Sequence, residues 1–159
     1  MIQPPNTHLA EVNIGRTRGT PDSAVMEDFV RLTDPINALA ERSPGFVWRL
    51  TGDGNNAMDV RYSDDPLEAI NLSVWETPAH LAEFVWKTAH QKVYNRKAEW
   101  FEAPKKPHFV MWWVPAGHTP SVQEAIERLE HYREHGTSEH AFSWMDLPEA
   151  KIFQERRCA

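Results

Sequence analysis

The segment 84–101, FVWKTAHQKVYNRKAEWF, places one histidine among aromatic residues at helical spacing. On a single helix Trp86, His90 and Trp100 would share a stripe, because residues three or four apart lie on the same side. A neutral imidazole can accept a proton near neutral pH or bind iron. We therefore predict that His90 faces a ligand pocket as a base or substrate contact. The alternative is a half-buried histidine that bonds to a backbone carbonyl.

Polar residues also interrupt the segments that alternate like strands. Because alternate strand residues face opposite sides, five of them can share one side of a sheet. These five are Glu11, Asn13, Arg49, Asn71 and Ser73. One interpretation is structural, with a salt bridge between Glu11 and Arg49. The other is a polar cluster in an aromatic cavity, where Arg49 or Asn71 stabilises an oxyanion while His90 removes a proton.

The chain carries seven tryptophans. Aromatic residues in that number fill cores, oligomer interfaces or pockets for flat ligands. We predict that a flat or apolar ligand contacts some of them, the candidates being Trp48, Trp75, Trp86, Trp100 and Trp113. Parity sends Trp48 and Trp75 to opposite faces of the sheet, so these tryptophans cannot all line one cavity.

Three further matches to motifs have simpler explanations. HYREH, at 131–135, matches a zinc metalloprotease pattern, but too little chain follows for the third ligand, and a solvated helix end is expected. GDGNNA, at 52–57, fits a loose dinucleotide-binding pattern without the helix that must follow it, so we interpret it as a turn. His118, in PAGHTP, is also assigned to a turn.

Hydrophobic periodicity predicts an α+β order of elements. Strands are expected at 8–14, 46–52, 69–76 and 107–117, with helices at 20–43 and 77–101. Pro35 should kink the first helix, because proline removes a helical donor. The order is the ferredoxin-like β-α-β-β-α-β plan, a sandwich with both helices on one face of an antiparallel sheet.

The whole chain, 1–159, is predicted to be a single domain with a core at about 7–117 and a C-terminal extension at about 118–159. A capping box at Ser121 begins an added helix in that extension, and a short strand is expected at 141–145. The strand at 107–117 is apolar on both sides, which indicates that the second sheet face is also covered. A homodimer that closes sheet to sheet would cover it.

Composition excludes several classes of function. The chain has 23 acidic and 17 basic residues, a net charge of −6, which is the wrong sign for a nucleic-acid binder. It contains no apolar run approaching the roughly 20 residues that a membrane helix needs. The N-terminus, MIQPPNTHLAEV, has no export signal, so a cytoplasmic location and a small-molecule partner are expected.

The segments GFVWRL, NLSVWE and WWVPAGHTP resemble a bacterial family of uncharacterised domains, domain of unknown function 3291, from about Thr7 to Met145. That family in turn resembles the dimeric α+β barrel superfamily of antibiotic-biosynthesis monooxygenases. The resemblance implies a homodimer with a ligand cavity between sheet and helices in each subunit. It also implies chemistries that range from cofactor-free oxygenation and isomerisation to haem degradation.

Three functions remain open at this point. The leading hypothesis is a cofactor-independent, monooxygenase-like or isomerase-like enzyme in which His90 and Arg49 are catalytic and Asn13 and Asn71 contact the substrate. No cofactor or metal is predicted for that enzyme. The resemblance implies an alternative, a haem protein with His90 as the axial ligand, because haem-degrading members bind iron through a histidine on the second helix. The third is a ligand-binding dimer without catalysis.

Overall fold

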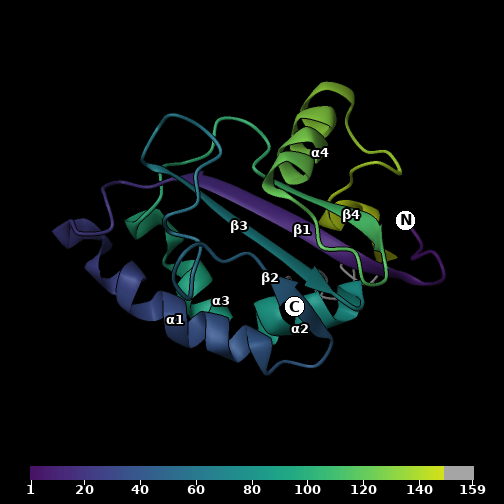
Figure 1. Cartoon of the computed structure of the whole chain (residues 1–159), viewed down its shortest axis with the longest axis horizontal. Coiled ribbons are helices and arrows are strands. Elements are labelled where there is room, and N and C mark those ends of the chain that lie inside the picture. Colours follow the sequence, from purple (N-terminus) through teal and green to yellow (C-terminus); the bar gives the residue numbers. More distant parts are fainter. Residues whose placement is uncertain (149–159) are drawn as a thin grey trace, which may run out of the picture.

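The computed structural model of the chain describes residues 1–148, which form a four-stranded antiparallel sheet with helices on both faces (Figure 1). The strands are β1 (Thr7–Arg16), β2 (Phe46–Arg49), β3 (Glu68–Trp75) and β4 (Phe109–Pro115), in the spatial order β2-β3-β1-β4. The helices are α1 (Glu27–Glu41), α2 (Pro78–Lys87), α3 (His90–Asn95) and α4 (Val122–His135). This arrangement confirms the predicted ferredoxin-like α+β fold. Among the described residues, no helix has the length and apolar character needed to cross a bilayer.

Side chains of the central strand β1 alternate between two covered faces of the sheet. Leu9 and Glu11 point to the face on which α1 and α2 pack, called here the α1/α2 face. Ala10 and Val12 point to the opposite face, which carries α4 and is called the α4 face. Figure 1 shows α4 on one side of the sheet and α1, α2 and α3 on the other.

The α4 face is buried within the single chain. Ala10, Val12 and Trp112 are 0% exposed, and so are the two α4 residues that pack against this cluster, Ala125 and Leu129. The apolar second face that led us to expect a sheet-to-sheet homodimer is therefore covered by the chain's own helix. A homodimer stays a prediction, and two α4 faces cannot meet directly while α4 remains in place.

The prediction of one continuous helix over 77–101 is wrong, and Thr88 is the cause. Its backbone is extended, so α2 ends before it and a separate six-residue helix, α3, begins at His90. The Thr88 hydroxyl donates to the carbonyl of Phe84 at 2.6 Å and accepts the N–H of His90 at 3.2 Å. Such side-chain bonds replace the helical hydrogen bonds that would have continued α2.

The proline in α1 does not end or split that helix. Pro35 lies inside α1 on its exposed side, where a missing backbone donor is cheapest. Ile36, Leu39 and Ala40 follow it and still pack against the α1/α2 face. Burial of these apolar residues outweighs the lost hydrogen bond.

The C-terminal extension is partly as predicted. Ser121 caps α4 by accepting the N–H of Glu124, and Gly136 ends the helix with a positive φ of 72°. The strand expected at 141–145 is reduced to a single bridge between Phe142 and Met111, because the chain turns at once into a capped 3₁₀ helix. The part of the extension beyond residue 148 lies outside the described residues.

Gly45, between α1 and β2, should tolerate no side chain. Its φ is +72°, and a β-carbon there would lie 1.9 Å from Nδ1 of His80. We expect Gly45→Ala to lower the free energy of unfolding by about 2–4 kcal/mol through backbone strain and overpacking. Denaturant unfolding of Gly54→Ala is the control, since no heavy atom lies within 4 Å of a β-carbon at that position. Equal stability of the two variants would show that Gly45 tolerates a side chain.

Candidate functional site

Cross-strand pairing sorts the side chains of the α1/α2 face into rows. One row is apolar and contains Phe46, Trp75, Leu9 and Trp113. The next row contains Arg49, Ser73, Glu11 and Met111, and the third contains Asn71, Asn13 and Phe109. The five polar strand residues predicted from parity do share one face. They occupy two adjacent rows in the middle of the sheet.

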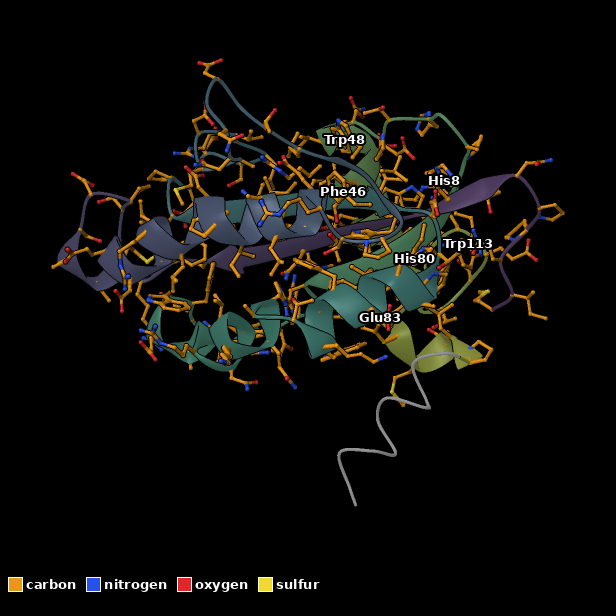
Figure 2. All side chains as sticks on the ribbon, turned by 90° about the horizontal axis from the view of Figure 1, so that it is seen from below. His8, Phe46, Trp48, His80, Glu83 and Trp113 are labelled. Atoms are coloured by element: carbon orange, nitrogen blue, oxygen red, sulfur yellow. The ribbon has the colours of Figure 1, made fainter. Side chains whose placement is uncertain are left out.

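Helices and loops cover this face at its two ends, and part of the face between them is exposed. At one end α1 and α2 pack on the apolar row. At the other, Phe101 lies so close to Gly15 that a β-carbon there would be 2.8 Å from the ring. Between these ends Asn13 and Asn71 are exposed, although they belong to the two central strands, and we call this pair the asparagine opening. In Figure 2 the purple strand β1 is seen between α1 and the α2–α3 segment.

Glu11 lies one row from the asparagine opening and is only 5% exposed. Ser73 Oγ donates a hydrogen bond of 2.5 Å to Oε1 of Glu11, and Trp75 Nε1 donates one of 3.0 Å to Ser73 Oγ. Burial raises the pKa of the Glu11 carboxyl from 4.5 to about 7, and the Ser73 hydrogen bond offsets part of this rise. The group can therefore accept or donate a proton near neutral pH.

Glu11 and Arg49 do not form the salt bridge that the structural interpretation expected. Ser73 lies on the strand between them, and the Arg49 guanidinium turns instead to Glu41 at 2.8 Å and Asn55 at 3.0 Å. The Nη1 of Arg49 is buried and makes no hydrogen bond within residues 1–148. The predicted oxyanion-stabilising role of Arg49 next to the reacting group therefore gains no support from this geometry.

The ring of His90 closes the C-terminal end of α2. Its Nδ1 lies 3.2 Å from the carbonyl oxygen of Val85, and since a carbonyl can only accept, Nδ1 carries the proton and Nε2 keeps its lone pair. Burial lowers the pKa of His90, with the Val85 bond acting in the opposite sense. This matches the structural alternative for His90, although a neutral Nε2 can still accept a proton. Phe84 contacts both rings: its centroid lies 4.8 Å from that of His90 and 5.1 Å from that of Trp75.

The predicted tryptophans do not converge on one cavity. Trp75 belongs to the Glu11 site, and Trp48 lies on the opposite face, as parity predicted. The other three pack against separate partners, Trp86 against Trp144 at 4.6 Å, Trp100 against Phe29 at 5.7 Å and Trp113 against Phe142 at 5.0 Å. The break at Thr88 is the reason that Trp86 and Trp100 share no stripe with His90.

A haem would need a flat hollow of several hundred Å³ next to Nε2 of His90. One partly open hollow, near the start of α1, has a volume of about 30 Å³ and is lined by residues that include Met26 and Phe29. An open depression is lined partly by Asp28, Glu99 and Trp100. His90 lines neither of them, so they offer no haem slot there, and we assign no step to haem. In residues 1–148 no group of three or more His, Cys, Asp or Glu side chains is arranged to hold a metal ion.

The sequence placed Glu11 in a polar cluster and suggested a salt bridge for it, but no catalytic role. The available signal was a lone carboxylate in HLAEVNI, inside a segment that alternates as a strand. That pattern does not show whether the strand lies at the edge or the centre of the sheet. Because β1 is central and both faces are covered, Glu11 is desolvated, and this alone makes its pKa unusual.

Sequence comparison agrees with the predicted resemblance. The model of a family described as a domain of unknown function (DUF3291) matches residues 8–158. The chain belongs to this family. No curated protein matches this DUF3291 protein.

Two solved structures from Nitrosomonas europaea are similar to this DUF3291 protein. One, provisionally described as an antibiotic biosynthesis monooxygenase, is 18% identical over 72% of this chain and 91% of its own, with a TM-score of 0.43. The other, a protein of unknown function, is 14% identical over 73% of this chain and 97% of its own, with a TM-score of 0.47. Similarity at this level transfers no activity, so function must be argued from the site itself.

Glu11→Gln should remove a pH dependence of stability. Below pH 4.5 Glu11 is protonated in both the folded and the unfolded chain. Between pH 4.5 and about 7 the folded chain keeps a proton that the unfolded chain has released, so the wild type loses stability as pH rises through this interval. The loss should total roughly 3 kcal/mol and stay constant above that interval.

The measurement is the difference in free energy of unfolding between Glu11→Gln and the wild type across this range of pH. We expect the difference to favour the variant increasingly up to about pH 7 and then to level off. Glu27→Gln, which alters an exposed carboxylate of α1, is the control. A difference that does not change with pH would show that Glu11 titrates normally.

Proposed function

We propose that this DUF3291 protein binds a small, flat molecule at the asparagine opening and transfers a proton between that molecule and Glu11. One observation carries the proposal: a carboxyl that titrates near pH 7 is buried in the centre of the sheet, one row from two exposed carboxamides. Ionisable groups with strongly perturbed pKa values concentrate at functional sites. The Oε2 of Glu11 makes no hydrogen bond to another described residue, which leaves it available to a ligand.

The chemistry follows from the groups around the opening. The Glu11 carboxylate takes a proton from an acidic C–H or O–H of the ligand, and the electron pair stays on a ligand oxygen. The side-chain N–H groups of Asn13 and Asn71 then stabilise the negative charge as hydrogen-bond donors. Returning the proton to another atom completes an isomerisation. If the ligand carbanion instead bonds to O₂ and the resulting hydroperoxide loses water, a ligand CH₂ becomes a carbonyl, which is the reaction of a cofactor-independent monooxygenase.

His90 and Glu11 compete for the role of base. The geometry favours Glu11, because the Nδ1 of His90 is engaged at the end of α2 and its ring is separated from Trp75 by Phe84. If Glu11 only forms a hydrogen bond to the ligand, the same site makes the protein a binder without turnover. The two functions differ in whether a ligand C–H exchanges with solvent.

Binding is tested by NMR with a library of small aromatic molecules that carry an acidic O–H. We expect the molecules that bind to shift the side-chain amide signals of Asn13 and Asn71, with exposed Asn6 as the internal control. Replacing both Asn13 and Asn71 with Ala should weaken their affinity by at least about 10-fold, since two hydrogen-bonding groups are lost. Binders that shift other regions and not this pair would refute the proposed site.

Catalysis is tested separately with a bound molecule that carries an acidic C–H, by following its exchange with deuterium from solvent. We expect the wild type to accelerate exchange, and Glu11→Gln to retain affinity while losing the acceleration. Exchange that persists in Glu11→Gln and disappears in His90→Ala would assign the base to His90. No acceleration by the wild type would leave only the binding function.

A further inference from the structure

Trp75, Ser73 and Glu11 form a buried chain of hydrogen bonds across two strands. The Trp75 indole N–H donates to Ser73 Oγ at 3.0 Å, and Ser73 donates to Glu11 at 2.5 Å. The exposed fractions of the three residues are 1%, 7% and 5%. Water therefore competes little for any of these bonds.

The direction of each hydrogen bond in this series is set by whether the groups can donate or accept. An indole N–H can only donate, and an ionised carboxylate can only accept. A serine hydroxyl has one hydrogen and two lone pairs, so Ser73 accepts from Trp75 and sends its own hydrogen to Glu11. With the indole bond in place, the Ser73 hydrogen is directed to the ionised form of Glu11.

The ring of Trp75 is held in place by its neighbours. Phe84 stacks on it at 5.1 Å with an interplanar angle of 25°, and Phe46 meets it edge-on at 5.4 Å and 87°. Both contacts use the ring and not the N–H. A phenylalanine at this position can keep much of this packing while removing only the donor.

We infer that Trp75 is a positioning residue for the proposed proton-transferring group, because its indole N–H orients Ser73 toward Glu11. The part that Trp75 plays in proton transfer rests on the proposed function. Its effect on the pKa of Glu11 does not, and that effect is what the experiment measures. Without the indole donor the Ser73 hydroxyl is free to rotate, and ionised Glu11 loses part of the hydrogen bond from Ser73. Glu11 then stays protonated up to a higher pH.

The test is the titration of the ¹³C-labelled Glu11 carboxyl by NMR in the wild type and four variants. We expect Trp75→Phe to raise the Glu11 midpoint by about 0.5–1 pH unit, and Ser73→Ala to raise it at least as far. Ser73→Thr, which keeps a hydroxyl, should restore the wild-type midpoint. Trp112→Phe is the matched control, because its indole bonds to Glu124 on the α4 face and its loss should leave Glu11 unchanged.

A measurement on the wild type covers the case in which Trp75→Phe does not fold. The indole proton signal of Trp75 should shift with pH at the midpoint of Glu11, because Ser73 connects the two groups. An indole signal that ignores the Glu11 titration, or a Trp75→Phe midpoint equal to the wild type, would overturn the inference. Either result would leave ligand binding at the asparagine opening untouched, whereas absence of ligand binding with an intact titration would refute only the proposed function.

Discussion

The central position of β1, with cover on both of its faces, is the constraint on which the rest of the structure depends. β1 pairs with β3 on one side and with β4 on the other, so its backbone groups are bonded along both edges. Its side chains must then enter either the α4 face or the α1/α2 face. The α4 face is apolar at Ala10, Val12 and Ile14 of β1 and is sealed there by the chain's own helix. On the α1/α2 face the polar residues divide, since Asn13 and Asn71 are exposed whereas Glu11 and Ser73 are buried.

Burying a carboxyl in such a strand costs free energy unless its hydrogen-bonding needs are met. Within residues 1–148 the side-chain donor to Glu11 is Ser73, which is itself held by Trp75, and no cation there lowers the pKa of the carboxyl. A hydrophobic residue at this position would pack without that cost. The arrangement is hard to explain as stabilisation, since burial outweighs the hydrogen bond in its effect on the pKa. It is understandable if the carboxyl serves a ligand that binds over Asn13 and Asn71.

A single threonine decides how the second helical segment meets the sheet. The Thr88 hydroxyl bonds the carbonyl of Phe84, and the ring of His90 bonds that of Val85, so two side chains cap the last turn of α2. The chain then changes direction and sends Trp86 and Trp100 to different neighbours. His90 therefore has a structural role at the end of α2, and its Nε2 is a secondary candidate for a proton acceptor.

The sequence by itself determined the order of the strands, the parity of β1, β3 and β4, the cap at Ser121, and the sharing of one face by the polar strand residues. A bulge in β2 puts Phe46 and Trp48 on opposite faces, which simple alternation does not predict. These features depend on local periodicity and on short-range hydrogen bonds, which neighbouring residues specify. Only the tertiary structure decided that α4 covers the second face, that Arg49 bonds to Glu41 and not to Glu11, and that Glu11 is the buried carboxyl beside an opening. Desolvation and long-range pairing depend on which strand is central and on what covers it, and residues far apart in the chain supply both.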